Sequence, residues 1–429
     1  MHVAQDGTNS QRWKVVAVVA VAVGLRVLLP LFALAIARTG PQFREPDSET
    51  YLRVADEWLQ TGRFAVLGKP EILRTPGYPF LLLPGIAVGR VDLVTIALQV
   101  LLACLTVWLV YRIAMLVSSQ KTALIAAWLF ACEPLSVLYT SKLLGETFFT
   151  TLVTAALFLL ALYVTSQSWR PLLAAAACVS AAAYVRPVAY YLPVWLALSL
   201  LLVLWRQASD RRRLALHATG FLALATALVA PWQVRNWIEA GYAGFAAISD
   251  QNLYFYEALP ILAEHEGLAP AQSNRARREA GELDMAVYLR RHPEQAGWTA
   301  AAHYRYLRRE ALRTIRAHPL AWARIHWSGM LLTLTDSGRN GWLSFFGLLD
   351  TSSPSNAAPP RGFWQRLTAA ASRQPLVLAI HLLLAAILAT YLLLALAGIL
   401  SSLRQSEALL LFSAALYLLL LSGGDAGYH

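Results

Sequence analysis

Long apolar runs separated by short polar stretches dominate the chain. The first run covers about 15–37. Further runs lie at about 92–117, 122–139, 147–166, 171–186, 188–205, 213–233, 375–402 and 407–422. About 20 apolar residues cross a bilayer as a helix, so these runs predict transmembrane helices, with the shorter ones buried among their neighbours. The apolar stretch 320–335 is short and predicts either a span or a re-entrant segment.

Three polar segments fall on one predicted side of the membrane. They are 38–91, 133–146 and 234–319. The turns on the other side carry basic residues, namely Arg112, Lys121, Arg170, Arg206, Arg211, Arg212 and Arg213. Positive charge marks cytoplasmic turns, so this pattern predicts a cytoplasmic N-terminus and an outer position for the three polar segments. The side on which 336–374 lies stays open.

Composition supports the membrane interpretation. Of the 429 residues, 57% are hydrophobic and only 14% are charged, and the mean hydropathy is +0.49. Soluble globular domains are less apolar and carry about 25% charged residues, and disordered chains are more polar still. The net charge of +11 resides largely in turns between apolar runs, which is not the pattern of a nucleic-acid-binding protein.

The expected fold is therefore an all-α polytopic membrane protein. An N-terminal transmembrane region (1–233) is followed by an external polar region (234–319) and a C-terminal transmembrane region (320–429). The cysteines Cys104, Cys132 and Cys178 lie in or beside apolar runs and share no metal-ligand spacing. We interpret them as buried small hydrophobic residues that form no disulfide.

The polar segment after the first span contains a candidate base. The spacing of Tyr51, Ala55, Trp58 and Leu59 predicts an amphipathic helix over 48–60, suited to a membrane surface. Asp47 stands just before this helix, where an aspartate commonly caps the free amides of the first turn. The same carboxylate is also suited to act as a general base. Glu45 and Glu49 carry the same chemistry nearby.

The sequence Arg74-Thr75-Pro76-Gly77-Tyr78-Pro79 returns the chain to the membrane. Two prolines and a glycine favour a fixed, non-helical entry. Arg74 is either part of a turn or held at the interface to bind an anionic headgroup, because a guanidinium binds phosphate oxygens in pairs.

Charged residues at membrane depth are costly and are therefore functional candidates. Arg186 in Tyr184-Val185-Arg186-Pro187 either snorkels to the interface or binds phosphate. Lys142 and Glu146 lie four residues apart and would form a simple ion pair on a helix. The alternative for Glu146 is a second acid that faces the site.

Two further motifs lie at and beyond the seventh span. Arg235 and Asn236, between Trp232 and Trp237, either belong to interfacial anchoring or orient a lipid phosphate. Tyr254 lies among aromatic and amide side chains in the stretch 250–256, which suits sugar stacking and a packed loop equally well.

The order of these motifs resembles a known family. D-S-x-x-Y after the first span is followed by R-T-P-G-Y-P, then E-P…S-K-x-x-G-E, then V-R-P, then A-P-W-x-x-R-N-W. This order is similar to that of bacterial relatives of the dolichyl-phosphate-mannose–protein mannosyltransferases, the group that includes the lipid A aminoarabinose transferase. The resemblance implies a GT-C bundle of about 9–11 transmembrane helices with external juxtamembrane helices, in the inner membrane of a bacterium.

The resemblance also implies roles for individual residues. Asp47 matches the family's catalytic base in the first external loop, and Glu146 matches the acidic residue of the second, where the family commonly has aspartate. Arg74, Arg186 and Arg235 occupy motif positions near the lipid-phosphate site. The residues expected to bind substrate are Arg74, Tyr78, Lys142, Arg186, Arg235, Asn236 and Tyr254. The family often continues into an Arg-rich motif, and this chain stops at 427–429, where such a motif would begin.

The implied function is an inverting transfer of sugar from a polyprenyl-phosphate donor to a lipid, glycan or protein acceptor at the outer face of the membrane. No metal-ligand cluster stands out in the sequence, and the involvement of a divalent cation near Asp47 and Glu146 stays open. One alternative is a transporter or flippase of lipid-linked sugars, in which the same arginines bind the donor without chemistry. Another is an O-antigen polymerase or ligase, whose arginines and histidines should lie mainly in 234–319.

Overall fold

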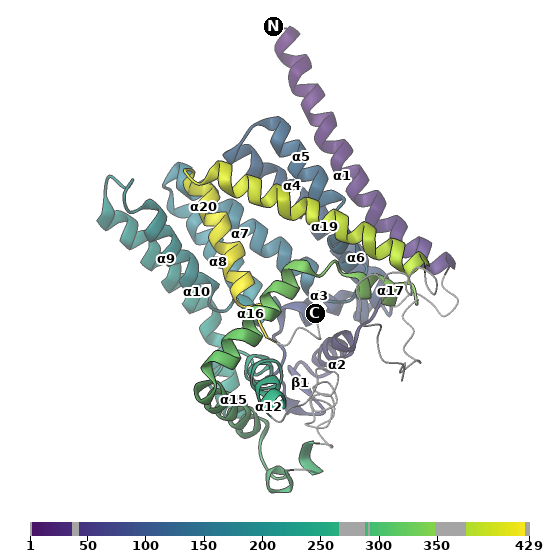
Figure 1. The fold of residues 1–429 in the computed structure, drawn as a ribbon, viewed down its shortest axis with the longest axis vertical. Coiled ribbons are helices and arrows are strands. Elements are labelled where there is room, and N and C mark those ends of the chain that lie inside the picture. The colour runs from purple at the N-terminus through teal and green to yellow at the C-terminus, as the bar shows by residue number, and fades with distance from the viewer. Residues whose placement is uncertain (1, 37–42, 266–287, 291, 348–374, 425–429) are drawn as a thin grey trace. The chain divides into compact units, whose positions relative to one another are not determined.

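The structure is a computed structural model, and most of its residues are helical (Figure 1). It describes residues 2–36, 43–265, 288–290, 292–347 and 375–424. The chain divides into two compact units, each assembled from segments that are far apart in sequence. Unit 1 comprises Met1–Thr50, Pro84–Leu162 and Thr335–Leu409, and unit 2 comprises Tyr51–Leu83, Tyr163–Leu334 and Leu410–His429.

Unit 1 is built from apolar helices. They are α1 (His2–Ile36), α4 (Val91–Val117), α5 (Gln120–Ala131), α6 (Pro134–Thr140), most of α7 (Glu146–Ser166), α17 (Arg339–Phe345) and α19 (Pro375–Ser402). Two helices cross the division between the units near the first external loop, α2 (Pro46–Thr61) and α3 (Gly77–Ala87).

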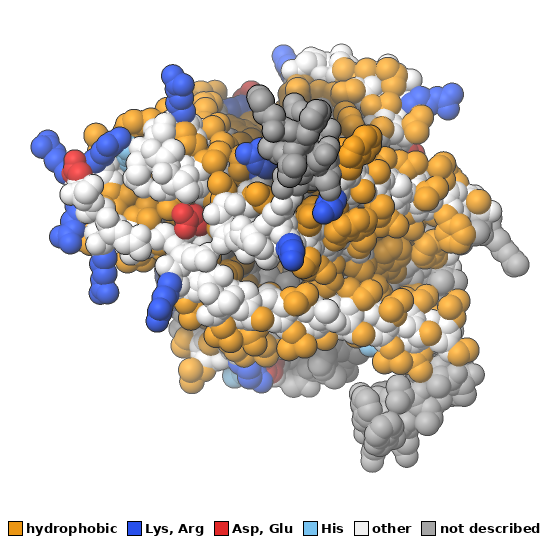
Figure 2. All heavy atoms as spheres, turned by 90° about the horizontal axis from the view of Figure 1, so that it is seen from above, with side chains coloured by type: hydrophobic (Ala, Val, Ile, Leu, Met, Phe, Trp, Pro, Cys, Tyr) orange, Lys and Arg blue, Asp and Glu red, His pale blue; other side chains and the backbone are white. Residues whose placement is uncertain are grey.

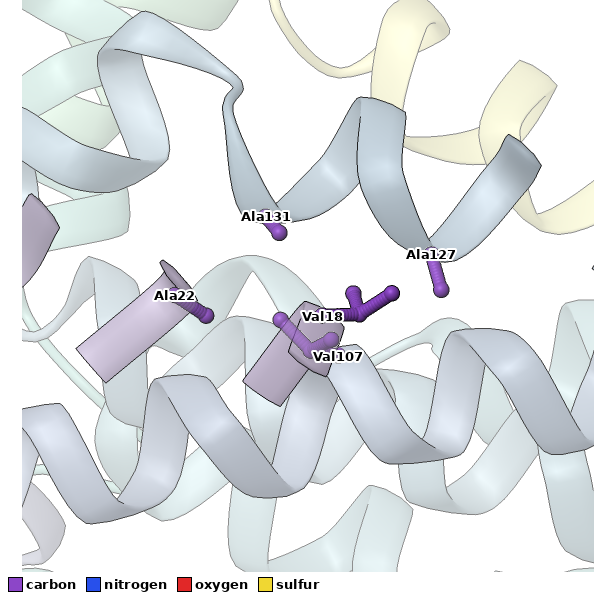
Figure 3. Close-up of a cluster of buried hydrophobic side chains, with 5 residues drawn as sticks. All are labelled: Val18, Ala22, Val107, Ala127 and Ala131. Atoms are coloured by element: carbon purple, nitrogen blue, oxygen red, sulfur yellow. The ribbon is translucent and has the colours of Figure 1, made fainter. Parts of the chain in front are cut away.

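Small side chains form the core between α1, α4 and α5 (Figure 3). Val18 and Ala22 from α1 meet Val107 from α4 and Ala127 and Ala131 from α5, and each of them is at most 2% exposed. Helices surrounded by lipid gain little from hydrophobic burial and associate through close packing, which small residues allow. This explains why alanine and valine occupy the buried centre of the shared face, with larger side chains such as Tyr111, Leu124 and Phe130 packed around it.

The predicted third span is broken between α5 and α6, which meet at an angle of 52°. The Arg26 guanidinium, fully buried in α1, donates to the Ala131 carbonyl at 2.7 Å and to Ser136 Oγ at 2.8 Å. The Glu133 carboxylate accepts from the amides of Leu135 and Ser136 at the start of α6. A helix break inside lipid leaves backbone groups without partners, and these two charged side chains supply them.

Unit 2 contains the remaining helices. They are α8 (Trp169–Val185), a 3-10 turn (Pro187–Ala189), α9 (Leu192–Leu204), α10 (Arg211–Ala240), α11 (Ile248–Asn252), a π-helical turn (Leu253–Ala258), α12 (Leu259–His265), a 3-10 turn (Pro293–Gln295), α15 (Ala300–Ala317) and α16 (Pro319–Thr335). The helix α20 (Ser406–Leu420) begins in unit 1 and lies mostly in unit 2.

A short hairpin follows α2 in unit 2. Strands β1 (Ala65–Val66) and β2 (Lys69–Pro70) pair antiparallel around Leu67 and Gly68, which both have positive φ. Positive φ at both central residues is typical of the type I′ turn that joins tight two-residue hairpins. The Glu57 carboxylate of α2 accepts from the amides of Leu67 and Gly68 at 2.6 and 2.8 Å. The hairpin is thereby fixed to the helix that precedes it.

The polar segment 38–91 packs against the long polar segment 234–319 through Ile72. Ile72 shares a buried cluster with Tyr242, Ala247 and Ala301, and the Ala247 amide donates to the Ile72 carbonyl at 2.8 Å. The long segment therefore has a core of its own, to which the first loop contributes. A second buried cluster consists of Phe255, Leu259, Tyr288 and Leu307.

Six described helices are long and apolar enough to cross a membrane, or seven if the broken pair counts as one span. They are Trp13–Ala35, Val91–Val117, Glu146–Ser166, Pro187–Leu204, Arg211–Ala240 and Pro375–Ser402. The predicted spans 171–186 and 407–422 form apolar helices that are shorter than this criterion, Trp169–Val185 and Ser406–Leu420. Figure 2 shows Lys and Arg side chains at separate points over a mainly hydrophobic surface. The all-α, polytopic membrane architecture predicted from the sequence is confirmed.

Several local predictions need correction. The entry at Gly77 is helical, because α3 begins there. The seventh span runs on to Ala240, so Arg235 and Asn236 belong to a helix. The stretch 320–335 forms the helix α16, which is not among the candidate spans of the described residues. The cysteines were expected to be buried, but Cys132 is exposed and Cys104 and Cys178 are only partly buried; all three are free.

Candidate active site

Asp47 lies inside the first turn of α2, because the helix begins at Pro46. The helix begins two residues earlier than predicted, at 46 instead of 48. Asp47 therefore does not precede the helix, and Glu45 is the residue before its start. Proline is favoured at the first helical position, where its missing amide costs nothing. A carboxylate in the first turn also interacts favourably with the helix dipole. The Thr50 hydroxyl donates to the Asp47 carbonyl at 2.7 Å, a contact within the same helix.

The start of α2 is attached to the loop between α6 and α7, the second of the polar segments. Ser48 Oγ accepts from the Glu45 amide at 2.9 Å and donates to the Leu143 carbonyl at 2.8 Å. The Leu143 amide in turn donates to the Phe43 carbonyl at 2.8 Å. The Lys142 ammonium forms an ion pair with Glu45, and its side chain is only 3% exposed. All of these residues belong to unit 1, so this connection is internal to one compact body.

The second loop is itself fixed to α4. Gln99 is fully buried and donates to the carbonyls of Thr140 and Lys142 at 2.9 and 2.8 Å. Arg44, which precedes α2, forms a bidentate ion pair with Asp92 at the start of α4, at 3.1 and 3.2 Å. One pair of hydrogen bonds thus anchors the segment 140–142 to α4, and the other anchors Arg44, three residues before Asp47, to the start of the same helix.

Lys142 and Glu146 do not share a helical face. α6 ends at Thr140 and α7 begins at Glu146, so Lys142 stands in the loop between them. The ion pair predicted from the spacing of four residues required both side chains to lie on one helix, which they do not. Lys142 pairs with Glu45 from the first loop. Glu146 lies at the first position of α7, near the positive end of that helix dipole.

In unit 2, Arg74 lies against an aromatic pair. Its guanidinium is 4.7 Å from the centre of the Tyr51 ring and donates to the Tyr51 hydroxyl at 3.4 Å. Tyr51 packs edge-on against the fully buried Tyr78, with ring centres 5.0 Å apart. Glu71 Oε1 accepts from the Arg74 amide at 3.0 Å. Tyr78 therefore supports Tyr51 and Arg74 from within the core.

The motifs that carry Arg74 and Arg186 are packed together. A Cβ placed on Gly77 would lie 2.6 Å from the carbonyl atoms of Tyr184 and 2.7 Å from the Val185 nitrogen. Gly77 is thus required for close approach of two backbones, not for a turn. α8 ends at Val185 because Pro187 cannot continue it, and Arg186 has an extended backbone. The contact brings the starts of α3 and of the turn after α8 into one place.

Arg235 binds backbone carbonyls of the segment between α2 and α3. Its guanidinium donates to the carbonyls of Glu71 and Phe64, both at 2.5 Å, and pairs with Glu239 at 2.8 Å. It also lies over the Trp232 ring, 4.9 Å from the ring centre. These contacts use Arg235 to fix the hairpin to α10. A direct contact with a lipid phosphate stays a prediction.

Asn236 is fully buried beside Arg235. Its amide nitrogen donates to the carbonyls of Gly244 and Phe245, at 3.2 and 3.0 Å, and its oxygen accepts from Arg235 at 3.1 Å. The side chain thereby stabilises the turn that follows α10. Its expected role in substrate binding likewise stays a prediction.

Tyr254 and Asp250 lie in the external segment. Tyr254 is half-buried in the π-helical turn, edge-on to Phe255 at 5.1 Å, and burial raises the pKa of its hydroxyl. Asp250 is buried and accepts from the Tyr242 hydroxyl at 2.9 Å. Burial raises the pKa of Asp250, against the opposing effects of Tyr242 and Arg308. Sugar stacking on Tyr254 remains an expectation.

Among the described residues, no three His, Cys, Asp or Glu side chains come together in a group suited to a metal ion. The involvement of a divalent cation, left open by the sequence, is not tested by this observation.

Sequence reasoning overlooked residues that hold this region together. Ser48, Gln99 and Arg26 are each fully buried, and each bonds to carbonyls from distant segments. Two of them carried a visible signal, because Arg26 and Gln99 are polar residues within long apolar runs. Ser48 is part of the D-S-x-x-Y motif, but a serine in the first turn of a helix is ordinary and its distant partner was not visible.

The long apolar helices define an integral membrane protein of the helical class. Residues 73–234 match the family model of the dolichyl-phosphate-mannose-protein mannosyltransferases. The match confirms, over that part of the chain, the resemblance inferred from the motif order. It includes Arg74, Lys142, Glu146 and Arg186 and begins after Asp47.

Solved oligosaccharyltransferases from Archaeoglobus fulgidus are similar at low identity. AglB in complex with an inhibitory peptide and a dolichol-phosphate is 15% identical, with a TM-score of 0.48, and the match covers 96% of this chain and 50% of that one. The apo form is 14% identical, with a TM-score of 0.46 and coverage of 96% and 50%. This chain therefore spans about half the length of those structures. No curated protein matches it significantly.

Proposed function

We propose that this chain is an inverting GT-C glycosyltransferase that moves a sugar from a polyprenyl phosphate to an acceptor at the outer face of a bacterial inner membrane. The observation that carries the proposal is the family match over 73–234, which contains five of the expected site residues, Arg74, Tyr78, Lys142, Glu146 and Arg186. The acceptor is a lipid, a glycan or a protein. The sugar donor and membrane lipids are the remaining partners.

Asp47 is the proposed general base. Its carboxylate takes a proton from the acceptor nucleophile, which attacks the anomeric carbon as the bond to the phosphate oxygen breaks. A single displacement inverts the configuration at that carbon. The anchoring of the neighbouring backbone through Ser48 and Lys142 supports this assignment, because catalysis requires a base held in fixed geometry. Glu146, at the start of α7, is the second acidic candidate.

Arg74 and Arg186 are the proposed ligands of the departing phosphate. The polyprenyl phosphate gains negative charge as it leaves, and a positioned guanidinium stabilises that charge where it develops. The packing of Gly77 on Tyr184 supports a joint role, because it brings the two arginine-bearing motifs into contact. A phosphate leaving group needs little protonation, so the reaction requires no general acid.

The test is sugar transfer in membranes from a labelled polyprenyl-phosphate mannose. Asp47→Asn is compared with the wild type at equal expression, and Asp56→Asn is the matched control. Asp56 is an exposed aspartate on the same helix whose carboxylate accepts from Gln60. We expect Asp47→Asn to lose at least about 100-fold in rate while still binding the donor, because a general base contributes about 10²–10⁴-fold. Asp56→Asn should transfer normally.

Other outcomes redirect the assignment. Unchanged turnover in Asp47→Asn removes Asp47 from catalysis and makes Glu146→Gln the next variant. A wild-type protein that transfers neither mannose nor aminoarabinose from such donors contradicts the transferase proposal. Movement of the donor across vesicles by both wild type and Asp47→Asn, without transfer, favours a transporter.

A further inference from the structure

The two external loops of unit 1 are joined by a set of buried contacts, which we call the loop clamp and define as Glu45, Ser48, Gln99, Lys142 and Leu143. The clamp joins residues that are far apart in the chain, because Lys142 lies 97 residues after Glu45. Ser48, Gln99 and Leu143 are fully buried, and the Lys142 side chain is 3% exposed. Side chains this buried and already bonded within the protein are poorly placed to bind a lipid-linked substrate.

We propose that Ser48 and Lys142 are positioning residues that hold the Asp47 carboxylate in place through the loop clamp. This inference rests on the proposed function, and it replaces the expectation that Lys142 binds substrate. Ser48 is the residue next to Asp47, and its hydroxyl links the Glu45 amide to the Leu143 carbonyl. Lys142 neutralises Glu45 two residues before Asp47. The backbone on both sides of Asp47 is thereby tied to the second loop.

Gln99 extends the clamp into the transmembrane helices. Its amide donates to the carbonyls of Thr140 and Lys142, so the second loop cannot slide along α4 without breaking two buried hydrogen bonds. Leaving such groups without partners is costly in a buried site. The clamp therefore transmits the position of α4 to the first turn of α2.

The contacts also separate a buried ion pair from an exposed one. In the pair of Lys142 with Glu45 the side chains are 3% and 28% exposed, so the ammonium is buried, whereas the pair of Arg44 with Asp92 has side chains 42% and 40% exposed. Exposed pairs contribute little to stability, and loss of one partner of a buried pair leaves an uncompensated charge. Only the buried pair is expected to set the geometry of the segment.

The kinetic test measures kcat and KM for labelled polyprenyl-phosphate mannose in Ser48→Ala and Lys142→Met. A misplaced base slows the chemical step and leaves donor binding intact. We therefore expect kcat to fall about tenfold or more, with the donor KM within about threefold of wild type. Thr61→Ala is the matched control, because its hydroxyl donates to the Glu57 carbonyl at the opposite end of α2 from Asp47. It should keep kcat within about twofold of wild type.

The structural test is a double-mutant cycle on the thermal midpoint of the purified full-length protein in detergent. Glu45→Gln alone leaves the Lys142 ammonium buried without its partner. Lys142→Met alone leaves the partly exposed Glu45 carboxylate without this partner. We expect the double variant to melt above the midpoint that the sum of the two single losses predicts, since coupled residues are not additive.

Each result bears on one part of the inference. A raised donor KM with unchanged kcat in Lys142→Met shows that Lys142 contacts the donor and overturns the positioning role. An additive cycle overturns the clamp. A wild-type protein that transfers no sugar contradicts the proposed function, whereas the cycle still decides whether the clamp exists. Unchanged kcat in both Ser48→Ala and Lys142→Met overturns the link to Asp47 even when the cycle shows coupling.

Discussion

The backbone of Gly77 lies directly on the backbone of Tyr184, so closely that no side chain fits between them. A Cβ on Gly77 would be 2.6 Å from the Tyr184 carbonyl carbon and oxygen. Because backbone atoms cannot swing aside as a flexible side chain does, any larger residue at 77 must displace α3 or the end of α8. The contact joins the two motifs that carry Arg74 and Arg186.

Gly77→Ala should therefore destabilise unit 2. Overpacking in a tight interior costs about 1–3 kcal/mol, and we expect a lower thermal midpoint in detergent together with slower sugar transfer. Gly297→Ala is the control, because no atom lies within 4 Å of a Cβ at that position and its φ is not positive. If Gly77→Ala melts like Gly297→Ala, the close approach is not a constraint on the fold.

The broken span of unit 1 depends on Arg26. Replacing Arg26 by methionine keeps an unbranched side chain and removes the donors to the Ala131 carbonyl and to Ser136 Oγ. Carbonyls left without donors at membrane depth are costly, so we expect a loss of about 2 kcal/mol or more in unfolding free energy. Unfolding by a graded denaturing detergent, followed by circular dichroism, measures the loss.

Lys121→Met serves as the comparison for Arg26→Met, because it also removes one positive charge and lies exposed at the start of α5. It should change the unfolding free energy by less than about 0.5 kcal/mol, as surface substitutions usually do. Equal losses in the two variants would mean that Arg26 acts through net charge and not through the break.

Arg235→Lys separates a scaffold role from phosphate binding. Lysine keeps the charge but cannot reach the carbonyls of Phe64 and Glu71 with a planar fork. We expect faster hydrogen exchange over the hairpin 64–71 and an unchanged donor KM. Arg63→Lys, at an exposed arginine beside the hairpin, should leave the exchange as in wild type. A raised donor KM without faster exchange would instead support the phosphate contact.

Asp250 should make the stability of unit 2 depend on pH. Burial raises the pKa of Asp250 in the folded protein above its ordinary value of about 3.9. Between these two values the folded state binds more protons than the unfolded state, so stability falls as pH rises through that window. Asp250→Asn, which keeps the shape and an acceptor for Tyr242, removes this dependence.

Thermal midpoints of Asp250→Asn and wild type, taken at intervals from pH 4 to pH 8, check this prediction. The thermal midpoint of the variant should rise relative to that of the wild type as pH rises. The difference between the two midpoints should become constant above the raised pKa. Asp56→Asn, at an exposed aspartate, should run parallel to the wild type throughout. A difference between Asp250→Asn and wild type that does not vary with pH would contradict the burial effect.

Much of the helical framework was predictable from hydrophobicity. The spans starting near 15, 92, 147 and 375 begin in the structure at Trp13, Val91, Glu146 and Pro375. The bilayer imposes one length and one polarity on every such helix, and both are visible in the sequence. α3 escaped this reasoning because its run, Gly77–Ala87, is too short to span and contains Pro84.

The candidate site was predictable in part. Motif order selected the external loops and their charged residues, and residues 73–234 match the expected family. The partner of Lys142 was not predictable, because Glu45 is distant in sequence and Glu146 offered a plausible local alternative. Arg235 was expected near a phosphate, yet its donors are directed at two carbonyls of the first loop.

The sequence by itself determined that the helices lie in lipid, approximately where the spans run, and which charged residues lie at their ends. These properties follow from transfer of side chains between water and lipid, which depends on composition and periodicity along the chain. Only the tertiary structure decided which donor bonds to which acceptor, as with the Ser48 hydroxyl and the Leu143 carbonyl. It also decided why position 77 must be a glycine. Hydrogen bonds and close packing depend on neighbours in space, and those neighbours are fixed only when segments far apart in the chain come together.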